Sequence, residues 1–92
     1  NGPTALFGGQ DNSVGEIAGH EITLEEFQAA VQERENNYIL NFGRQAGERE
    51  MVTLRQQAWD LLIARHAITP QFDRVGVDVT ADEIWDMIQG RN

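Results

Sequence analysis

The run Leu61-Leu62-Ile63 constrains the fold of this chain more than any other feature of the sequence. Three consecutive residues of an α-helix sweep about 200° of its surface, whereas a helix that packs on one side needs an apolar stripe of only about 100°. The run belongs to a helical pattern that begins near Glu48. We therefore predict a central helix that other elements cover on more than one side.

A second helix is expected before the central one. Thr23 and Glu26 have the spacing of a capping box, in which the hydroxyl accepts from the third helical N–H and the glutamate reaches back. Apolar residues then recur at three- and four-residue steps as far as Phe42, and Gly43 suits the end of a helix. One slot of this stripe falls at Arg34 or Glu35, and Arg34 can fill it with its aliphatic stem while its head reaches solvent. The polar connection that follows is short, which predicts an antiparallel neighbour.

A short β-hairpin is expected at the start of the folded region. Residues 14–17 and 20–22 flank the dipeptide Ala18-Gly19. A two-residue type I′ turn requires positive φ at both central positions and favours Asn-Gly, so alanine there costs about 1 kcal/mol. Because a lone hairpin is only marginally stable in water, it must pack against helices or other strands.

Two further helical segments follow the central helix. Pro70 interrupts the pattern, so the helix either kinks there or restarts with Thr69 as its cap and Pro70 as its first residue. This segment ends at Gly76, a predicted C′ residue, and Thr80 to Glu83 form a second capping box. The last helix carries apolar residues that need a surface to cover: Ile84, Trp85, Met87 and Ile88.

The predicted fold class is mainly α, with a short N-terminal β-hairpin followed by three or four helices. The chain has 92 residues, of which 40% are hydrophobic, and a domain of this size buries only about 60–65% of its unfolded surface. The hairpin and the last helix both lack an evident covering partner, so we expect an incomplete domain. Residues 1–13 are rich in glycine and small polar residues and are predicted to be a flexible linker, with the folded module at 14–90.

Charge and motif content exclude most chemical functions. Fifteen acids against seven arginines give a net charge of −8, which argues against a nucleic-acid partner and against an anionic membrane surface. There is no cysteine, and His20 and His66 lack metal-ligand spacing, so we expect ordinary packed or surface histidines and no metal site. The single serine, Ser13, lies in the predicted linker, which excludes a catalytic triad. We predict no catalytic residue and no cofactor.

Excess apolar surface on short helices is the remaining functional signal. Such surface suits shape-tolerant binding of unfolded or flexible peptides. The candidate peptide-binding residues are Phe27, Tyr38, Phe42, Trp59, Phe72 and Trp85. The alternative is a structural module whose aromatic face serves only intramolecular docking or oligomerisation.

Three stretches of the chain carry a family resemblance. Residues 14–27, VGEIAGHEITLEEF, resemble the opening V-x-x-V-N-G-x-x-I-[ST]-x-x-E-F of the SurA/PpiD-type periplasmic folding factors. Residues 59–68, WDLLIARHAI, and 72–84, FDRVGVDVTADEI, are similar to a later pattern of the same family. Ala18 departs from the family's turn asparagine, and Pro70 departs from its continuous long helix.

The resemblance implies the N-terminal chaperone segment of a parvulin-type peptidyl-prolyl cis-trans isomerase. The catalytic domains follow this segment in the family, so none of their residues lies in the chain. Residues 6–9, LFGG, are similar to the stretch after the single membrane anchor of PpiD-like isomerases. This likeness implies a periplasmic location, with the parent anchored in the inner membrane and membrane contact only through an anchor outside the segment.

The resemblance also implies the partners. Unfolded or nascent outer-membrane or secreted polypeptides are the expected clients. In the family, C-terminal material of the parent chain completes the N-terminal segment. We therefore expect the isolated fragment to form a homodimer, or to exchange an element, in order to bury Trp85 and its neighbours.

Overall fold

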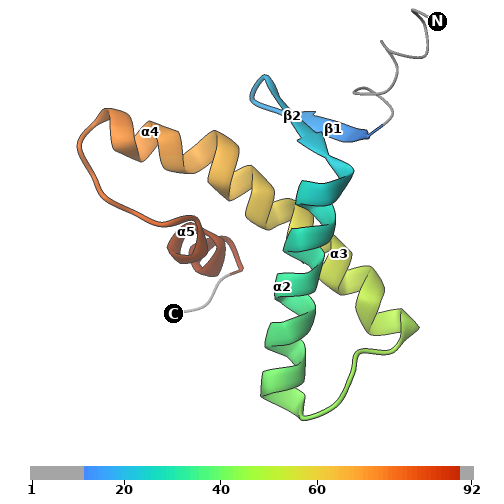
Figure 1. Cartoon of the computed structure of the whole chain (residues 1–92). Coiled ribbons are helices and arrows are strands. Elements are labelled where there is room, and N and C mark those ends of the chain that lie inside the picture. Colours follow the sequence, from blue (N-terminus) through green and yellow to red (C-terminus); the bar gives the residue numbers. More distant parts are fainter. Residues whose placement is uncertain (1–11, 90–92) are drawn as a thin grey trace, which may run out of the picture.

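The structure is a computed structural model that describes residues 12–89. Its elements are β1 (Ser13–Ile17), β2 (His20–Thr23), α2 (Leu24–Phe42), α3 (Glu48–Ile63), the π-helical turn η1 (Ala64–Ile68), α4 (Thr69–Arg74) and α5 (Ala81–Ile88). The helices α3, η1 and α4 form one continuous rod that α2 crosses (Figure 1). The predicted fold, a hairpin followed by helices, is confirmed.

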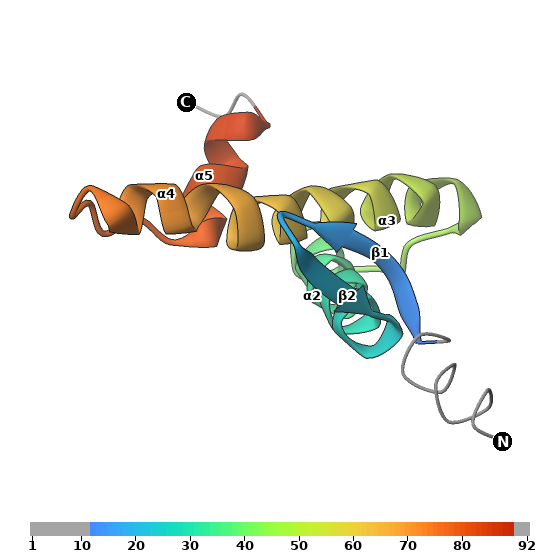
Figure 2. The same ribbon diagram turned by 90° about the horizontal axis from the view of Figure 1, so that it is seen from above.

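The rod is central, as the apolar run predicts. Seen from above, α2 and the hairpin lie on one side of the rod and α5 lies on the other (Figure 2). Leu61 and Leu62 are both fully buried, because neighbouring residues of a helix point to different sides and both sides of this helix are covered. Ile63 is partly buried and packs against the core.

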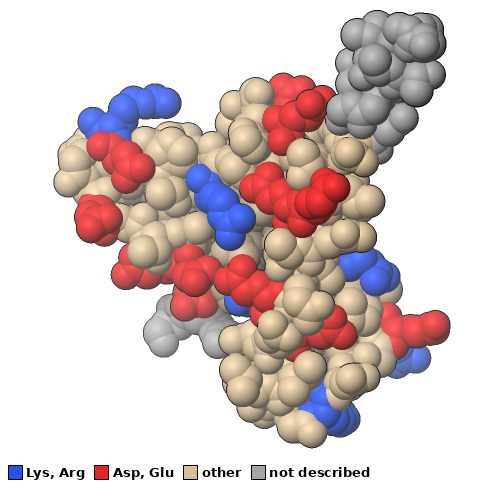
Figure 3. Space-filling model, in the orientation of Figure 1, with Lys and Arg blue, Asp and Glu red and all other residues tan. Residues whose placement is uncertain are grey.

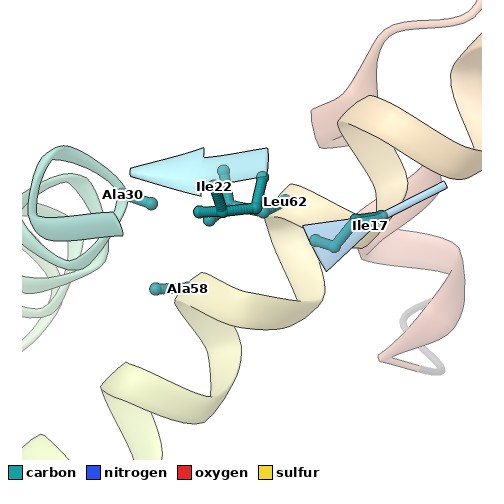
Figure 4. Close-up of a cluster of buried hydrophobic side chains, with 5 residues drawn as sticks. All are labelled: Ile17, Ile22, Ala30, Ala58 and Leu62. Atoms are coloured by element: carbon teal, nitrogen blue, oxygen red, sulfur yellow. The ribbon is translucent and has the colours of Figure 1, made fainter. Parts of the chain in front are cut away.

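The main core lies where the hairpin meets the crossing of α2 and α3. It consists of Ile17, Ile22, Ala30, Ala58 and Leu62, which point toward one another from four elements (Figure 4). The alanines stand where the two helices meet, and small side chains there allow the helix axes to approach. This packing provides the cover that a lone hairpin needs.

The hairpin has the predicted two-residue turn. Ala18 has φ 52° and Gly19 has φ 81°, the positive values that a type I′ turn requires at both positions. β1 pairs antiparallel with β2, and an irregularity falls between Ser13 and Gly15. The predicted linker 1–13 lies outside the described residues except for its last two, of which Ser13 already belongs to β1.

Both predicted threonine caps are present, but the two boxes differ. Thr80 accepts from the Glu83 N–H and the Glu83 carboxylate accepts from the Thr80 N–H, so the box at α5 is complete. At α2, Thr23 accepts from the Glu26 N–H. The Glu26 carboxylate turns to His66 instead of the cap backbone, so the second half of this prediction is wrong.

The helix continues through Pro70 because the turn before it widens from an α-helical to a π-helical one. A proline ring clashes with the carbonyl four residues earlier in a regular α-helix, and the π-turn η1 lies directly before α4. Thr69 has helical φ and ψ, and its hydroxyl has no hydrogen-bond partner among the described residues. Of the two alternatives, a restart with Thr69 as N-cap is therefore wrong, because a π-turn accommodates the proline without ending the helix.

The rod ends as predicted. Gly76 has φ 81°, and the N–H groups of Val77 and Gly76 donate to the carbonyls of Phe72 and Asp73. These are the two bonds of a Schellman motif. Residues 77–80 then lead without regular structure to α5, which packs against α3 and η1. The predicted end of the folded module at residue 90 lies outside the described residues.

The molecule is flat and open for its length. Its extents are 51 × 40 × 15 Å and its radius of gyration is 15.5 Å, whereas about 12 Å is typical of a compact domain of 92 residues. Large apolar side chains remain exposed, Leu40 by 83% and Phe42 by 61%. An open shape with uncovered apolar side chains is what an incomplete domain presents. None of the helices that the structure describes has the length and apolar content needed to cross a bilayer.

Candidate peptide-binding groove

Two hollows lie on opposite faces of α3. The α3 residues that line the first hollow are Val52, Arg55, Gln56 and Trp59, and those that line the second are Glu50, Thr53, Leu54 and Gln57. At 100° per residue, the mean directions of these two sets differ by roughly 160° around the helix. The hollows are therefore separate surfaces, each completed by a different partner of α3.

The first hollow, here called the hairpin groove, lies between β1, the first turn of α2 and α3. It has a volume of about 400 Å³ and is lined by Val14, Leu24, Phe27, Val52, Arg55, Gln56 and Trp59. Five of these seven side chains are apolar. Val14, Leu24 and Val52 are 45%, 39% and 62% exposed, so the groove presents apolar side chains to solvent.

Local packing fixes the walls of this groove. The Thr23 cap fixes the start of α2 and therefore the position of Leu24 at its first residue. The ring of Phe27 meets that of Trp59 edge to face, with centroids 6.2 Å apart. Gly15 lies directly over Trp59, since a Cβ on Gly15 would stand 2.6 Å from ring atom Cη2. Glycine is therefore required for the strand to approach the indole this closely.

The second hollow, here called the α5 hollow, lies between α2, α3 and α5. It has a volume of about 580 Å³, and its lining is more polar. Among its residues are the acids Glu50, Asp82 and Asp86. At its apolar end, the rings of Tyr38 and Phe42 lie 4.5 Å apart.

Trp85 lines the α5 hollow, but its ring is covered and its indole N–H is hydrogen-bonded within the chain. Its side chain is buried, with the residue 7% exposed. The guanidinium of Arg34 lies over the ring, 4.4 Å from the centroid, and the indole N–H donates to the carbonyl of Gln57 at 3.2 Å. The slot that Arg34 occupies on the apolar stripe of α2 is thus filled by packing on Trp85.

The six candidate aromatic residues do not form one site. Phe27 and Trp59 line the hairpin groove, whereas Tyr38, Phe42 and Trp85 line the α5 hollow. Phe72 is partly buried on α4 and lines neither of these hollows in the described part of the chain. The sequence analysis missed the aliphatic walls of the hairpin groove: Val14, Leu24 and Val52. Their periodicity in the sequence places these residues on the apolar faces of a strand and two helices. Only the packing in the structure reveals that their side chains stay exposed.

A polar cluster lies where β2, the first turn of α2 and η1 meet. His66 Nε2 is 2.6 Å from Glu26 Oε2, and His20 Nε2 is 3.6 Å from Glu26 Oε1. The two imidazole rings stack with centroids 4.0 Å apart. Arg65 Nη1 also lies 3.7 Å from the carboxylate. The two histidines stand 46 positions apart in the sequence, so spacing along the chain could not reveal this cluster.

The histidines set the ionisation of Glu26. Burial by itself would raise the pKa of this carboxyl group. The hydrogen bond with His66 and the charges of both histidines outweigh burial, so the pKa lies below its ordinary value of 4.5. Glu26 is therefore an ionised carboxylate at neutral pH, with two imidazole nitrogens directed at it.

Comparison with known proteins identifies the family. Neither the curated proteins nor the solved structures contain a match to the chain. A family model described as the SurA-like N-terminal domain matches residues 2–92. This match spans nearly the whole chain. The chain belongs to the family of SurA-like N-terminal domains.

Proposed function

We propose that this chaperone-like segment of a SurA-type protein captures unfolded polypeptide in the hairpin groove. The observation that carries the proposal is the exposure of three aliphatic side chains, Val14, Leu24 and Val52, beside the half-buried ring of Trp59. Apolar side chains of an unfolded chain that enter this groove leave water, which stabilises the complex by about 25 cal/mol per Å² of apolar surface buried.

The groove suits clients of varied sequence. Its apolar contacts depend on area rather than on direction, so different side chains can occupy it. Arg55 and Gln56, which also line the groove, offer hydrogen-bond donors to the carbonyls of a bound backbone. A groove this small binds weakly and reversibly, which prevents aggregation without trapping the client.

Charge narrows the client class. The chain carries a net charge of −8, and acidic side chains gather over the hairpin and the first turns of α2 (Figure 3). Acidic clients are repelled from such a surface, whereas neutral and basic segments approach it readily. We propose unfolded outer-membrane or secreted polypeptides with neutral or basic apolar segments as clients.

The proposal extends to the parent protein. Family membership and the similarity of residues 6–9 to a post-anchor stretch support a parent that is a parvulin-type peptidyl-prolyl isomerase. They also support a periplasmic location, with the parent anchored in the inner membrane. Client capture by this segment then holds unfolded chains near the isomerase domains. The coding sequence after Asn92 tests this part directly, since a parvulin domain is expected there.

Fluorescence anisotropy with a labelled, uncharged peptide rich in aromatic and aliphatic residues tests the groove. The variant Leu24→Gln/Val52→Gln removes two exposed walls and is expected to weaken binding about tenfold, because each change leaves apolar client surface against a polar group. The matched control Leu40→Gln/Val75→Gln changes the same residue types at positions 83% and 72% exposed outside the groove. Equal affinity of the two variants contradicts the proposal.

The alternative is a structural module that docks other parts of the parent chain or a second copy. The exposed side chains of Leu40 and Phe42 at the end of α2 favour it. The burial of Trp85 removes one reason for dimerisation, because its ring is already covered. Sedimentation at high concentration distinguishes the two: concentration-dependent association without peptide binding supports the structural module.

A further inference from the structure

We propose that His20, Glu26 and His66 form a binding site for a divalent transition metal ion of the Zn²⁺ type. Two imidazole nitrogens and one carboxylate oxygen lie within 4.8 Å of one another. Nitrogen ligands from histidine and an oxygen ligand from a carboxylate are the set that Zn²⁺ accepts together with a water molecule. The proposal does not depend on peptide binding, because none of the three residues lines the hairpin groove.

The three ligand atoms lie near the spacing that zinc needs, but the two imidazole rings are stacked with only 16° between their planes and would have to rotate until both Nε2 lone pairs meet at one point. Two ligands of a tetrahedral zinc ion, each about 2.0–2.1 Å from the metal, stand about 3.4 Å apart. His66 Nε2 and Glu26 Oε2 are 2.6 Å apart and would separate slightly, whereas His20 Nε2 is 3.6 Å from Glu26 Oε1 and is already near this spacing. Both imidazoles direct the same nitrogen, Nε2, at the same carboxylate.

Two local features of the fold form this cluster. Glu26 occupies the third position of α2, where a glutamate ordinarily completes the capping box, as Glu83 does at α5. Its carboxylate faces the histidines instead. His66 lies within the π-turn η1, the widened turn before Pro70, and its imidazole reaches the Glu26 carboxylate. Departures from local rules concentrate where a protein has a function to serve.

Access and charge favour a cation. The side chains of His20, Glu26 and His66 are 52%, 24% and 17% exposed. An ion can therefore reach the cluster from solvent on the side where His20 is exposed. The chain's net charge of −8 attracts cations generally. Arg65 opposes the ion, because its guanidinium lies 3.7 Å from the Glu26 carboxylate. Its side chain is 41% exposed and is free to turn toward solvent.

A bound ion would link three parts of the chain. His20 belongs to β2, Glu26 to the first turn of α2 and His66 to η1. An ion that binds the folded chain and not the unfolded one stabilises the fold by mass action. The hairpin, which forms one wall of the peptide groove through Val14, would then be held to the helices by coordination as well as by the core.

Isothermal titration of the untagged 92-residue chain with ZnCl₂ tests the site. One ion per chain is expected to bind saturably, and the melting midpoint is expected to rise by about 5 °C at saturating zinc. Mg²⁺ and Ca²⁺, which prefer oxygen ligands, are expected to leave the midpoint unchanged. Absence of zinc binding up to millimolar concentration, or equal binding of Mg²⁺, overturns the proposal.

Matched variants distinguish this site from diffuse attraction to acids. His20→Gln, His66→Gln and Glu26→Gln are each expected to weaken zinc binding at least about tenfold. Glu25→Gln removes the neighbouring exposed acid and is expected to preserve affinity. Arg65→Gln removes the competing cation and is expected to tighten binding several-fold. Unchanged affinity in Glu26→Gln, or equal losses in Glu25→Gln and Glu26→Gln, overturns the proposal.

A folding defect does not obscure the result. His20 is half exposed and lies outside the main core, so His20→Gln is expected to retain the far-ultraviolet circular dichroism of the parent chain. This variant remains decisive even if His66→Gln fails to fold. Zinc affinity retained in a folded His20→Gln variant contradicts a site made of all three ligands.

Discussion

The two tryptophans of the chain face the two hollows of α3 and differ in how far the chain covers them. Trp85 is covered on its ring face by Arg34, and its indole N–H is bonded to a backbone carbonyl. Trp59 is covered by Gly15 and by the edge of Phe27. Its remaining surface lines a groove whose other walls are exposed aliphatic side chains.

The difference in cover between Trp85 and Trp59 distinguishes a ring that anchors the fold from a ring that has surface left for a ligand. A buried ring whose polar atom is satisfied stabilises the fold and has little surface left for a ligand. A ring held in place by close packing on one side, with an apolar groove on the other, presents a rigid contact surface at little entropic cost. Under the proposed function, the two tryptophans therefore serve different purposes: Trp85 anchors α5, and Trp59 contacts bound polypeptide.

The largest effect is expected from removing the anchor. Trp85→Ala leaves a cavity where α5 meets α3 and η1, and it is expected to cost about 3–5 kcal/mol of unfolding free energy. Ile88→Ala on the same helix, at a residue that is 48% exposed, is expected to cost well under 1 kcal/mol. Urea denaturation measures both. Similar losses for the two variants would show that Trp85 is not the anchor of α5.

Gly15→Ala perturbs the ring on the other side of α3. The added Cβ would stand 2.6 Å from Trp59, so strand and ring must separate, at an expected cost of about 1–3 kcal/mol. In a Trp59→Leu background the same change is expected to cost much less, because the clashing ring is gone. Thermal denaturation of the double-mutant cycle measures this coupling. Additive losses would mean that the glycine is not required by the indole.

The cap of α5 contributes less than its anchor. Thr80→Ala removes the hydroxyl that accepts from the Glu83 N–H and is expected to cost about 1 kcal/mol. Thr80→Ser keeps the hydroxyl and is expected to be nearly neutral. Chemical denaturation of the two variants checks the assignment, and equal stabilities would count against it.

The smallest effect is expected at the hairpin turn, with the opposite sign. Ala18 has φ 52°, a region that asparagine tolerates better than alanine. Ala18→Asn is therefore expected to stabilise the chain by about 0.5–1 kcal/mol and to raise the melting temperature. Ala18→Val, which is β-branched, is expected to lower it. A stability gain for valine would contradict the type I′ turn.

Most of the fold could be predicted from local sequence rules. The central rod follows from Leu61-Leu62-Ile63, and the bounds of α2 follow from Thr23 and Gly43. These features rest on helix periodicity, capping and glycine conformations, which neighbouring residues determine. The path of the backbone through Pro70 could not be predicted, because a kink, a restarted helix and a π-turn can each accommodate the proline ring and its missing N–H.

Much less of the candidate site could be predicted. Residue type and period identify Phe27, Trp59 and Trp85 as apolar helix positions but not which of them the fold covers. That outcome depends on Gly15 and Arg34, which approach the two indoles from other elements. The cluster around Glu26 was missed for the same reason, since its members come from three elements.

The two indole N–H signals in a ¹H–¹⁵N correlation spectrum test the central claim most directly. Titration of the ¹⁵N-labelled chain with the uncharged apolar peptide is predicted to shift the Trp59 signal progressively. The Trp85 signal is predicted to stay in place, because its N–H remains bonded to the Gln57 carbonyl. A stationary Trp59 signal, alone or beside a shifting Trp85 signal, would contradict capture of unfolded polypeptide in the hairpin groove.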